Sequence, residues 1–310
     1  MTGSFDERAV TAALGRAVTR FAPSPTGRLH LGHALSALTS FDLARRLGGR
    51  FLIRIEDIDP ERCRPELIGE MFTVLRWLGV TWEEPVLQQS EHMPVYAAAA
   101  ARLAAMGLLY PCFATRGEIE AAAQPGLVDP DGAPVYPGLH RHLAATEVAR
   151  RQAAGEAFAM RIDMQRAIDR AVAKAGRDAL AFTEIDAALV PQRVAADPGR
   201  WGDAVIQRKV APTSYHLSVV VDDARQGVTI VTRGADLRAA TDIHRLLQIL
   251  LDYPEPLYFH HPLLLGADGR KLSKRDGATG LAQMQALGVT AAEIRRRLGL
   301  ADVGSVAART

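Results

Sequence analysis

The stretch RFAPSPTGRLHLGH at residues 20–33 decides the fold of this chain. Residues 18–22 alternate in β-branched or apolar character, and the prolines at 23 and 25 cannot donate to a sheet ladder, so a strand ends here. From residue 31 onward, apolar side chains recur at helical spacing. They are Leu31, Ala34, Leu35, Leu38 and Phe41. The pattern therefore predicts a strand, a tight loop and a helix that begins at the two histidines.

The start of this helix is a natural site for an anion. A helix N-terminus presents unpaired N–H groups and the positive end of the helix dipole, which suits a phosphate group. The imidazoles of His30 and His33 would add donors, and Gly32 has no Cβ to keep a ring system away from the backbone. The HxGH tetrapeptide alone is equally consistent with an accidental match or with histidines that only cap the helix.

A second strand is predicted at residues 51–59, FLIRIEDID, where apolar residues give way to carboxylates. Strand, helix and strand form a βαβ unit, in which ligands bind at the carboxyl ends of the strands. Glu56, Asp57 and Asp59 would then face the end of the first strand and could receive an ammonium group. For Asp59 we favour the alternative, a solvated strand end or a helix cap.

Composition sets the outer limits of the interpretation. The 310 residues are 48% hydrophobic and 23% charged with a net charge of +2, so a large core and more than one domain are expected. Contacts to nucleic acid would have to come from local patches. Two cysteines make no disulfide framework, and neither a signal peptide nor a membrane-spanning run is visible. We expect a cytoplasmic protein with no membrane partner.

The middle of the chain is predicted to be an insertion into the sheet. Residues 110–137 are rich in proline and glycine, which marks a change of domain. Helices are expected at 65–78, 93–106 and 146–155, and a strand at 157–162. The sheet should resume at 203–209, followed by a central strand at 215–221, YHLSVVV, and another at 228–232. A helix with Asp236 as its N-cap should come next.

Two basic features lie in the last third of the chain. Arg233 sits at a predicted strand end, where an arginine is an ion-pair or solvent residue more often than a ligand. The glycine-rich loop at 266–280 carries Lys271, Lys274 and Arg275, which could surround a polyphosphate or simply be solvated. Residues 282–308 have room for two short helices.

Five segments together strongly resemble the catalytic core of class I glutamyl-tRNA synthetases, over residues 19–280. They are RFAPSPTGRLHLGH, FLIRIEDID, SYHLSVVVDD, TRGAD and KLSKRDGA. HLGH stands in place of that family's HIGH, and KLSKR in place of its KMSKS. The resemblance implies an α/β fold, a Rossmann-like parallel sheet with an inserted α+β domain. The expected parts are the first half of the catalytic domain at 1–109, an inserted, acceptor-binding-like domain at 110–200, the second half at 201–265, and the KMSKS-type loop with a short helical tail at 266–310.

The resemblance also implies roles for individual residues. L-Glutamate would be bound by Arg20, Phe21, Ala22, Pro23, Ser24, Glu56, Tyr215 and Arg233. ATP, entering with Mg²⁺, would be bound by His30, Gly32, His33 and Lys274, with His30, His33, Lys271 and Lys274 as the catalytic groups. The chemistry agrees, because either arginine can pair with a carboxylate while Glu56 and the Tyr215 hydroxyl can receive the ammonium. Which arginine binds which carboxylate stays open.

The tRNA expected to accept glutamate follows from the number of residues after the basic loop. Only 35 residues follow Arg275, which leaves no room for an anticodon-binding domain. The chain therefore resembles the truncated, glutamyl-queuosine branch of the family. Its expected partners are L-glutamate, ATP and the anticodon stem-loop of tRNA(Asp) carrying queuosine, and we expect a monomer. The alternatives are a short glutamyl-tRNA synthetase that charges tRNA(Glu), and an HxGH nucleotidyltransferase that does not act on tRNA.

The insertion departs from the family at a zinc site. The truncated branch often has a Cys-x-Cys pair, a tyrosine and a further cysteine there. This chain has Cys112, Ala114, Tyr136 and His140 at those positions. Tetrahedral zinc requires four ligands and alanine supplies none, so we expect a degenerate site without metal. The alternatives are a three-ligand site made by Cys112, Tyr136 and His140, or recruitment of His142.

Overall fold

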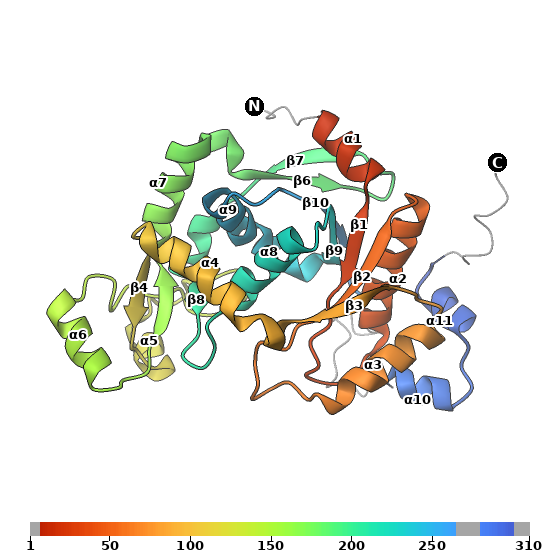
Figure 1. Ribbon diagram of the computed structural model, residues 1–310, viewed down its shortest axis with the longest axis horizontal. Coiled ribbons are helices and arrows are strands. Elements are labelled where there is room, and N and C mark those ends of the chain that lie inside the picture. The colour runs from red at the N-terminus through yellow and green to blue at the C-terminus, as the bar shows by residue number, and fades with distance from the viewer. Residues whose placement is uncertain (1–6, 265–279, 301–310) are drawn as a thin grey trace.

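The computed structural model describes residues 7–264 and 280–300 and contains a central sheet that is parallel except for one antiparallel edge strand, and a smaller antiparallel sheet (Figure 1). Lys271 and Lys274 lie outside the described residues. The first part of the chain forms α1 (Glu7–Gly15), β1 (Val18–Phe21), α2 (Leu31–Arg46), β2 (Arg50–Ile55), α3 (Glu66–Trp77) and β3 (Glu83–Gln88). These strands are parallel in the order β1-β2-β3. The predicted strand–loop–helix–strand unit is therefore confirmed.

A second set of strands continues the sheet beyond β1. It has the order β7-β6-β10-β9, with β6 (Ala181–Ile185), β7 (Pro191–Ala195), β9 (Ile230–Gly234) and β10 (Leu257–His261). β9 lies beside β1, because the Thr229 N–H donates to the Val18 carbonyl at 3.0 Å and the Val18 N–H donates to the Thr229 hydroxyl at 3.0 Å. From β1 the chain continues to β2 on one side, and from β9 it continues to β10 on the other side. The boundary between β1 and β9 is therefore the switch point of the sheet, where a ligand crevice is expected.

The antiparallel sheet belongs to the inserted region and lies at one end of the molecule in Figure 1. It contains β4 (Leu109–Cys112), β5 (Ala159–Ile162) and β8 (Val205–Gln207). The helices of this part of the chain are α4 (Met93–Ala105), α5 (Arg116–Ala122), α6 (Ala145–Ala153) and α7 (Met164–Ala175). Short 3₁₀ turns are η1 (Gln89–His92), η2 (Arg177–Ala179), η3 (Pro198–Trp201) and η4 (Ala235–Ala240). The boundaries of the four parts expected from the sequence stay predictions.

The segment YHLSVVV is not a strand. Residues 215–225 form helix α8 (Tyr215–Arg225), whose Leu217, Val219 and Val221 are buried in one cluster with side chains of α4 and of α9 (Thr241–Leu251). A helix covered on all sides shows no amphipathic period, and a short apolar run then resembles a buried strand. The prediction of a central strand was wrong for this reason.

Two smaller predictions also differ from the structure, and two strands were not predicted. Residues 203–209 do not resume the parallel sheet, because β8 pairs antiparallel with β5. Asp236 lies inside η4, whose N-cap is Gly234, and α9 begins only at Thr241. The strands β6 and β7 have no counterpart in the sequence-based prediction. Their pairing partners are each other and β10, which lies more than 60 positions further along the chain.

The C-terminal residues pack on the first half of the sheet. The two expected short helices are α10 (Leu281–Ala286) and α11 (Ala291–Arg297), and their buried Leu281 and Ile294 join the core cluster formed by α2, α3, β1 and β2. Arg295 pairs with both carboxylate oxygens of Asp42 on α2, each at 2.8 Å. No helix among the described residues is long and apolar enough to cross a membrane.

Candidate active site

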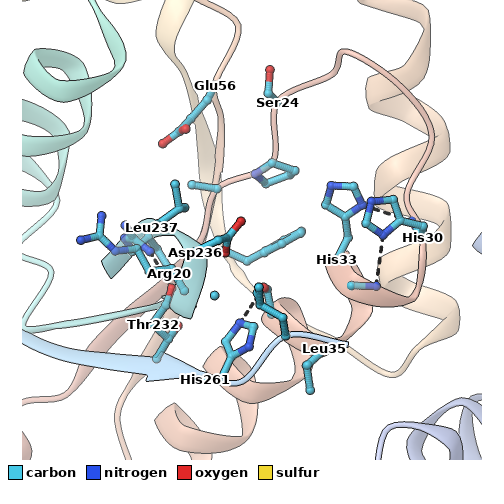
Figure 2. Close-up of a pocket in the computed structure, with 18 of the residues that line it drawn as sticks. Arg20, Ser24, His30, His33, Leu35, Glu56, Thr232, Asp236, Leu237 and His261 are labelled. Atoms are coloured by element: carbon cyan, nitrogen blue, oxygen red, sulfur yellow. Dashed lines mark hydrogen bonds between the residues drawn. The ribbon is translucent and has the colours of Figure 1, made fainter. Parts of the chain in front are cut away.

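A cavity of about 290 Å³ opens at the switch point, beyond the carboxyl ends of β1 and β9 (Figure 2). Its lining includes every glutamate-site residue expected from the sequence. These are Arg20, Phe21, Ala22, Pro23, Ser24, Glu56, Tyr215 and Arg233. His30, Gly32 and His33 line the same cavity from the start of α2, and Figure 2 shows the two histidines across the pocket from Glu56 and Arg20. The fold thus brings together residues that are up to 213 positions apart.

The two histidines both cap α2 and face the cavity. His30 Nδ1 accepts the Gly32 N–H at 3.1 Å, and His33 Nδ1 accepts the His30 N–H at 3.1 Å. A neutral imidazole that accepts at Nδ1 carries its proton on Nε2, so each ring presents an N–H donor on its far side. A Cβ at Gly32 would lie only 3.0 Å from His30 Cε1. Glycine is therefore needed to let the His30 ring fold over the helix start.

Arg20 is held by a carboxylate that the sequence-based prediction missed. Its Nε donates to Asp223 Oδ1 at 3.0 Å, and its Nη1 donates to the Thr232 carbonyl at 3.0 Å. The fully buried Arg54 donates to the same Asp223 Oδ1 at 2.8 Å. Burial alone would raise the pKa of Asp223, but Arg20 and Arg54 outweigh it and lower the pKa. A charged residue inside an apolar run, such as Arg54 in FLIRI, is the signal that could have revealed this network, because buried charges require partners.

Arg233 differs from Arg20 in having only neutral partners among the described residues. Its Nε donates to His260 Nε2 at 3.3 Å, its Nη1 to His244 Nδ1 at 3.1 Å, and its Nη2 to Thr241 Oγ1 at 2.5 Å. No carboxylate of the described residues forms an ion pair with it, although the residue is only 5% exposed. Burial and the Arg233 charge lower the pKa of His260 to about 4 and hold that of His244 well below its ordinary value.

Glu56 is the acidic residue of the FLIRIEDID segment that lines this pocket. Its Oε1 accepts from Arg54 Nη2 at 3.2 Å, and burial raises the pKa of the carboxyl although Arg54 opposes the rise. Asp57 was also expected to face the end of the first strand, and this was wrong. Its carboxylate instead accepts from the backbone N–H and the hydroxyl of Ser90 at 2.8 and 2.7 Å. Asp59 is neither a solvated strand end nor a helix cap, because it is buried, pairs with Arg208 at 2.7 Å and lines the second cavity described below.

The former zinc positions are close together but do not fit a zinc ion. Cys112 donates to the Tyr136 hydroxyl at 3.3 Å, and His140 Nδ1 accepts the N–H groups of Phe113 and Ala114 at 3.1 and 3.2 Å. That nitrogen is already used by the backbone, and Ala114 supplies no ligand. Within residues 7–264 and 280–300, no group of three His, Cys, Asp or Glu side chains is arranged to hold a metal.

A larger cavity of about 650 Å³ adjoins the first one and extends toward the inserted region. The two cavities share Ser24, Glu56 and Tyr215. Four buried polar atoms on the wall of this second cavity lack a hydrogen-bond partner within the described part of the chain. They are Gln89 Oε1, Arg161 Nε, Trp201 Nε1 and Ser214 Oγ. Each of these four atoms is itself covered by protein, so they do not face the open space of the cavity.

Several known proteins are similar to this chain in sequence and in fold. Residues 16–305 match the family described as "tRNA synthetases class I (E and Q), catalytic domain". A glutamyl-Q tRNA(Asp) synthetase of Rhodobacter capsulatus is 46% identical over 288 residues, which are 91% of this chain and 100% of that protein. Its counterpart in Symbiobacterium thermophilum is 43% identical, over 87% of this chain and 82% of that protein. A solved glutamate tRNA ligase from Elizabethkingia meningosepticum, in complex with its amino acid, has a TM-score of 0.67 and 26% identity over 84% of this chain and 52% of that one.

The parallel sheet, the pocket at its switch point and these similarities define a class I aminoacyl-tRNA synthetase, which is a ligase. The match extends over nearly the whole described chain and includes both sheets. The chain belongs to the glutamyl and glutaminyl branch of that class, and within it to the family of glutamyl-Q tRNA(Asp) synthetases.

Proposed function

We propose that the protein activates L-glutamate with ATP and transfers the glutamyl group to queuosine at the wobble position of tRNA(Asp). One observation carries the proposal: a single pocket holds a buried arginine whose partners among the described residues are all neutral, a half-buried carboxylate and the HxGH helix start. These three features match the side-chain carboxylate, the ammonium group and the nucleotide phosphate that the reaction brings together. The names of the two similar bacterial enzymes support the choice of acceptor.

The amino acid would be oriented by charge. Arg20 already pairs with Asp223, whereas the charge of Arg233 is balanced by none of the described carboxylates, so Arg233 is the better partner for the glutamate side chain. Glu56 and the Tyr215 hydroxyl would receive the ammonium, and the positive charge would favour the ionised form of Glu56. The α-carboxylate then faces the start of α2.

Activation would require no protein nucleophile. An oxygen of the α-carboxylate attacks the α-phosphorus of ATP, and the bond between that phosphorus and the pyrophosphate oxygen breaks. The Nε2–H groups of His30 and His33, with the backbone at the start of α2, would stabilise the charge on the α-phosphate. Lys271 and Lys274, assigned from the sequence, would neutralise the departing pyrophosphate. Mg²⁺ entering with ATP would supply further charge neutralisation at the phosphates.

The second cavity would receive the acceptor. It meets the first cavity at Ser24, Glu56 and Tyr215, next to the expected position of the activated carbonyl. Its lining includes charged side chains such as Arg62, Asp131 and Arg208, which suit a polar ring bearing hydroxyl groups. A hydroxyl of the queuosine ring would attack the carbonyl carbon, and AMP would leave. Both tRNA and ATP are cytoplasmic, so the activity would be cytoplasmic.

The test is the transfer of labelled glutamate to purified tRNA. We expect label on tRNA(Asp) that contains queuosine and none on tRNA(Asp) that lacks it or on tRNA(Glu). We also expect glutamate-dependent ATP–pyrophosphate exchange in the absence of tRNA. Label on tRNA(Glu) alone would show that the enzyme charges a terminal adenosine instead, and exchange without transfer to any tRNA would leave a nucleotidyltransferase.

A further inference from the structure

The three groups that hold Arg233 form a cage of neutral acceptors. His244 and Thr241 belong to the start of α9, and His260 belongs to β10, so the cage joins two elements behind the end of β9. The exposed fractions are 2% for His244 and 0% for Thr241. Water therefore does little to screen the guanidinium on this side.

Hydrogen bonding determines the protonation of both imidazoles. A guanidinium can only donate, so His260 Nε2 and His244 Nδ1 must accept from Arg233 and carry no proton. His260 Nδ1 then carries the proton and donates to Glu184 Oε1 at 2.5 Å. His244 Nε2 carries the other and donates to His216 Nδ1 at 3.3 Å. Each ring is held in one neutral tautomer by a partner on its far side.

The neighbouring arginines are arranged in the opposite way. Arg20 pairs with Asp223, and Arg54 pairs with Asp223 and Glu56. Glu184, the carboxylate nearest to the cage, is separated from Arg233 by the His260 ring and pairs with Arg238 at 2.8 Å. Arg20, Arg54 and Arg238 therefore each have a carboxylate partner, whereas Arg233 has none among the described residues.

We propose that His244, His260 and Thr241 determine the preference of the enzyme for a carboxylate over an amide at the amino-acid side chain. They position Arg233 with acceptors that carry no charge, so its full charge is available to the side chain of glutamate and gives no comparable advantage to glutamine. The inference rests on the proposed glutamate activation. A carboxylate in the cage would orient the guanidinium equally well, but it would cancel the charge that selects the substrate.

Paired variants that differ only in charge test this proposal. His244→Asn and His244→Asp both place an oxygen near the position of Nδ1, and only the second is negative. Thr241→Asn and Thr241→Asp form a second pair at the third acceptor. Initial rates of ATP–pyrophosphate exchange, measured with glutamate and with glutamine, give KM and kcat for each variant. Thermal melting and the KM for ATP report whether each variant is folded.

We expect each Asp variant to have a glutamate KM about 100-fold above that of its Asn counterpart, with a much smaller difference in kcat. The repulsion between two carboxylates about 6 Å apart, at an effective dielectric constant of about 20, corresponds to a change of about 100-fold in a binding constant. The KM for glutamine should change little within each pair, so the ratio of kcat/KM for glutamate to that for glutamine should fall at least tenfold. If His244→Asp does not fold, the Thr241 pair decides.

Equal glutamate KM values within both pairs, or an unchanged ratio of the two substrates, would overturn the proposal, because the cage would then only fill space. A failure of the proposed function looks different. In that case the wild-type enzyme shows no glutamate-dependent exchange at all, and the inference falls with the function before any variant is made.

Discussion

Replacing Arg54 by methionine tests the buried charge network beneath the pocket, and Arg50 on the same strand provides a matched control. Arg54 is fully buried, and it donates to Asp223 at 2.8 Å and to Glu56 at 3.2 Å. Arg50 donates to Glu83 at 2.9 Å, but the two side chains are 56% and 45% exposed. The two substitutions therefore remove the same chemical group, in one case from a buried network of carboxylates and in the other from a single exposed ion pair.

The expected losses of stability differ severalfold. Removing one partner of a buried ion pair reduces the free energy of unfolding by about 3–5 kcal/mol, because the carboxylates left behind have lost water as well as their counter-ion. An exposed pair contributes only about 0–1 kcal/mol. With an m-value of about 3 kcal/mol/M in urea, Arg54→Met should lower the unfolding midpoint by about 1 M or more. Arg50→Met should lower it by about 0.3 M or less.

The measurement is equilibrium unfolding in urea, followed by circular dichroism at neutral pH for the wild type and both variants. A separate exchange assay should show that Arg54→Met also raises the glutamate KM, since Glu56 loses its ion-pair partner. The reasoning is refuted if the two variants lose the same stability, or if Arg54→Met loses less than about 1 kcal/mol.

Four further outcomes are expected. Glu56→Gln should raise the glutamate KM about 10- to 100-fold and leave the KM for ATP unchanged in the exchange assay, because a hydrogen bond to a charged group is lost. Lys274→Ala should slow adenylate formation in single turnovers far more than it weakens glutamate binding by equilibrium dialysis, and equal losses would contradict a transition-state role. His140→Ala should reduce stability by about 1–3 kcal/mol, because it leaves two backbone N–H groups without an acceptor, and added Zn²⁺ should not alter the stability of the wild type. Stability should be full above pH 6.5 and fall toward pH 4, since burial lowers the pKa of His216 and His260 to about 4 in the folded state and the unfolded chain takes up protons first. Urea unfolding at several pH values should show up to about 1.4 kcal/mol per pH unit for each of these histidines, and a flat profile would contradict the assignment.

Short-range sequence patterns predicted those parts of the site that come from one continuous segment of the chain. The end of β1, the start of α2 and the carboxylate at the end of β2 all come from one βαβ unit, and proline, glycine and apolar spacing mark each of them. The same reasoning failed for YHLSVVV, because burial on all sides removes the periodicity by which a helix is recognised. It also missed β6 and β7, whose place in the sheet depends on pairing with a distant strand.

The roles of Arg20 and Arg233 show most clearly what could not be predicted from the sequence. Arg20 and Arg233 looked alike in the sequence, and either could have paired with the glutamate side chain. Asp223 lies 203 positions from Arg20 along the chain but accepts its hydrogen bond at 3.0 Å, whereas His244 and His260 surround Arg233. The charge that each arginine offers depends on these partners, and no local pattern contains them.

The sequence by itself determined the βαβ unit and the HxGH corner, because these follow from short-range periodicity and turn chemistry. The class of fold and the residues of the pocket came from the resemblance of its motifs to the class I glutamyl-tRNA synthetases. Only the tertiary structure decided that the pocket lies between β1 and β9, that a second cavity adjoins it, and that Arg233, unlike Arg20, has no ion-pair partner among the described residues. The physical reason is that electrostatic interactions depend on distance and burial in space, and the chain acquires both only when segments far apart in sequence pack together.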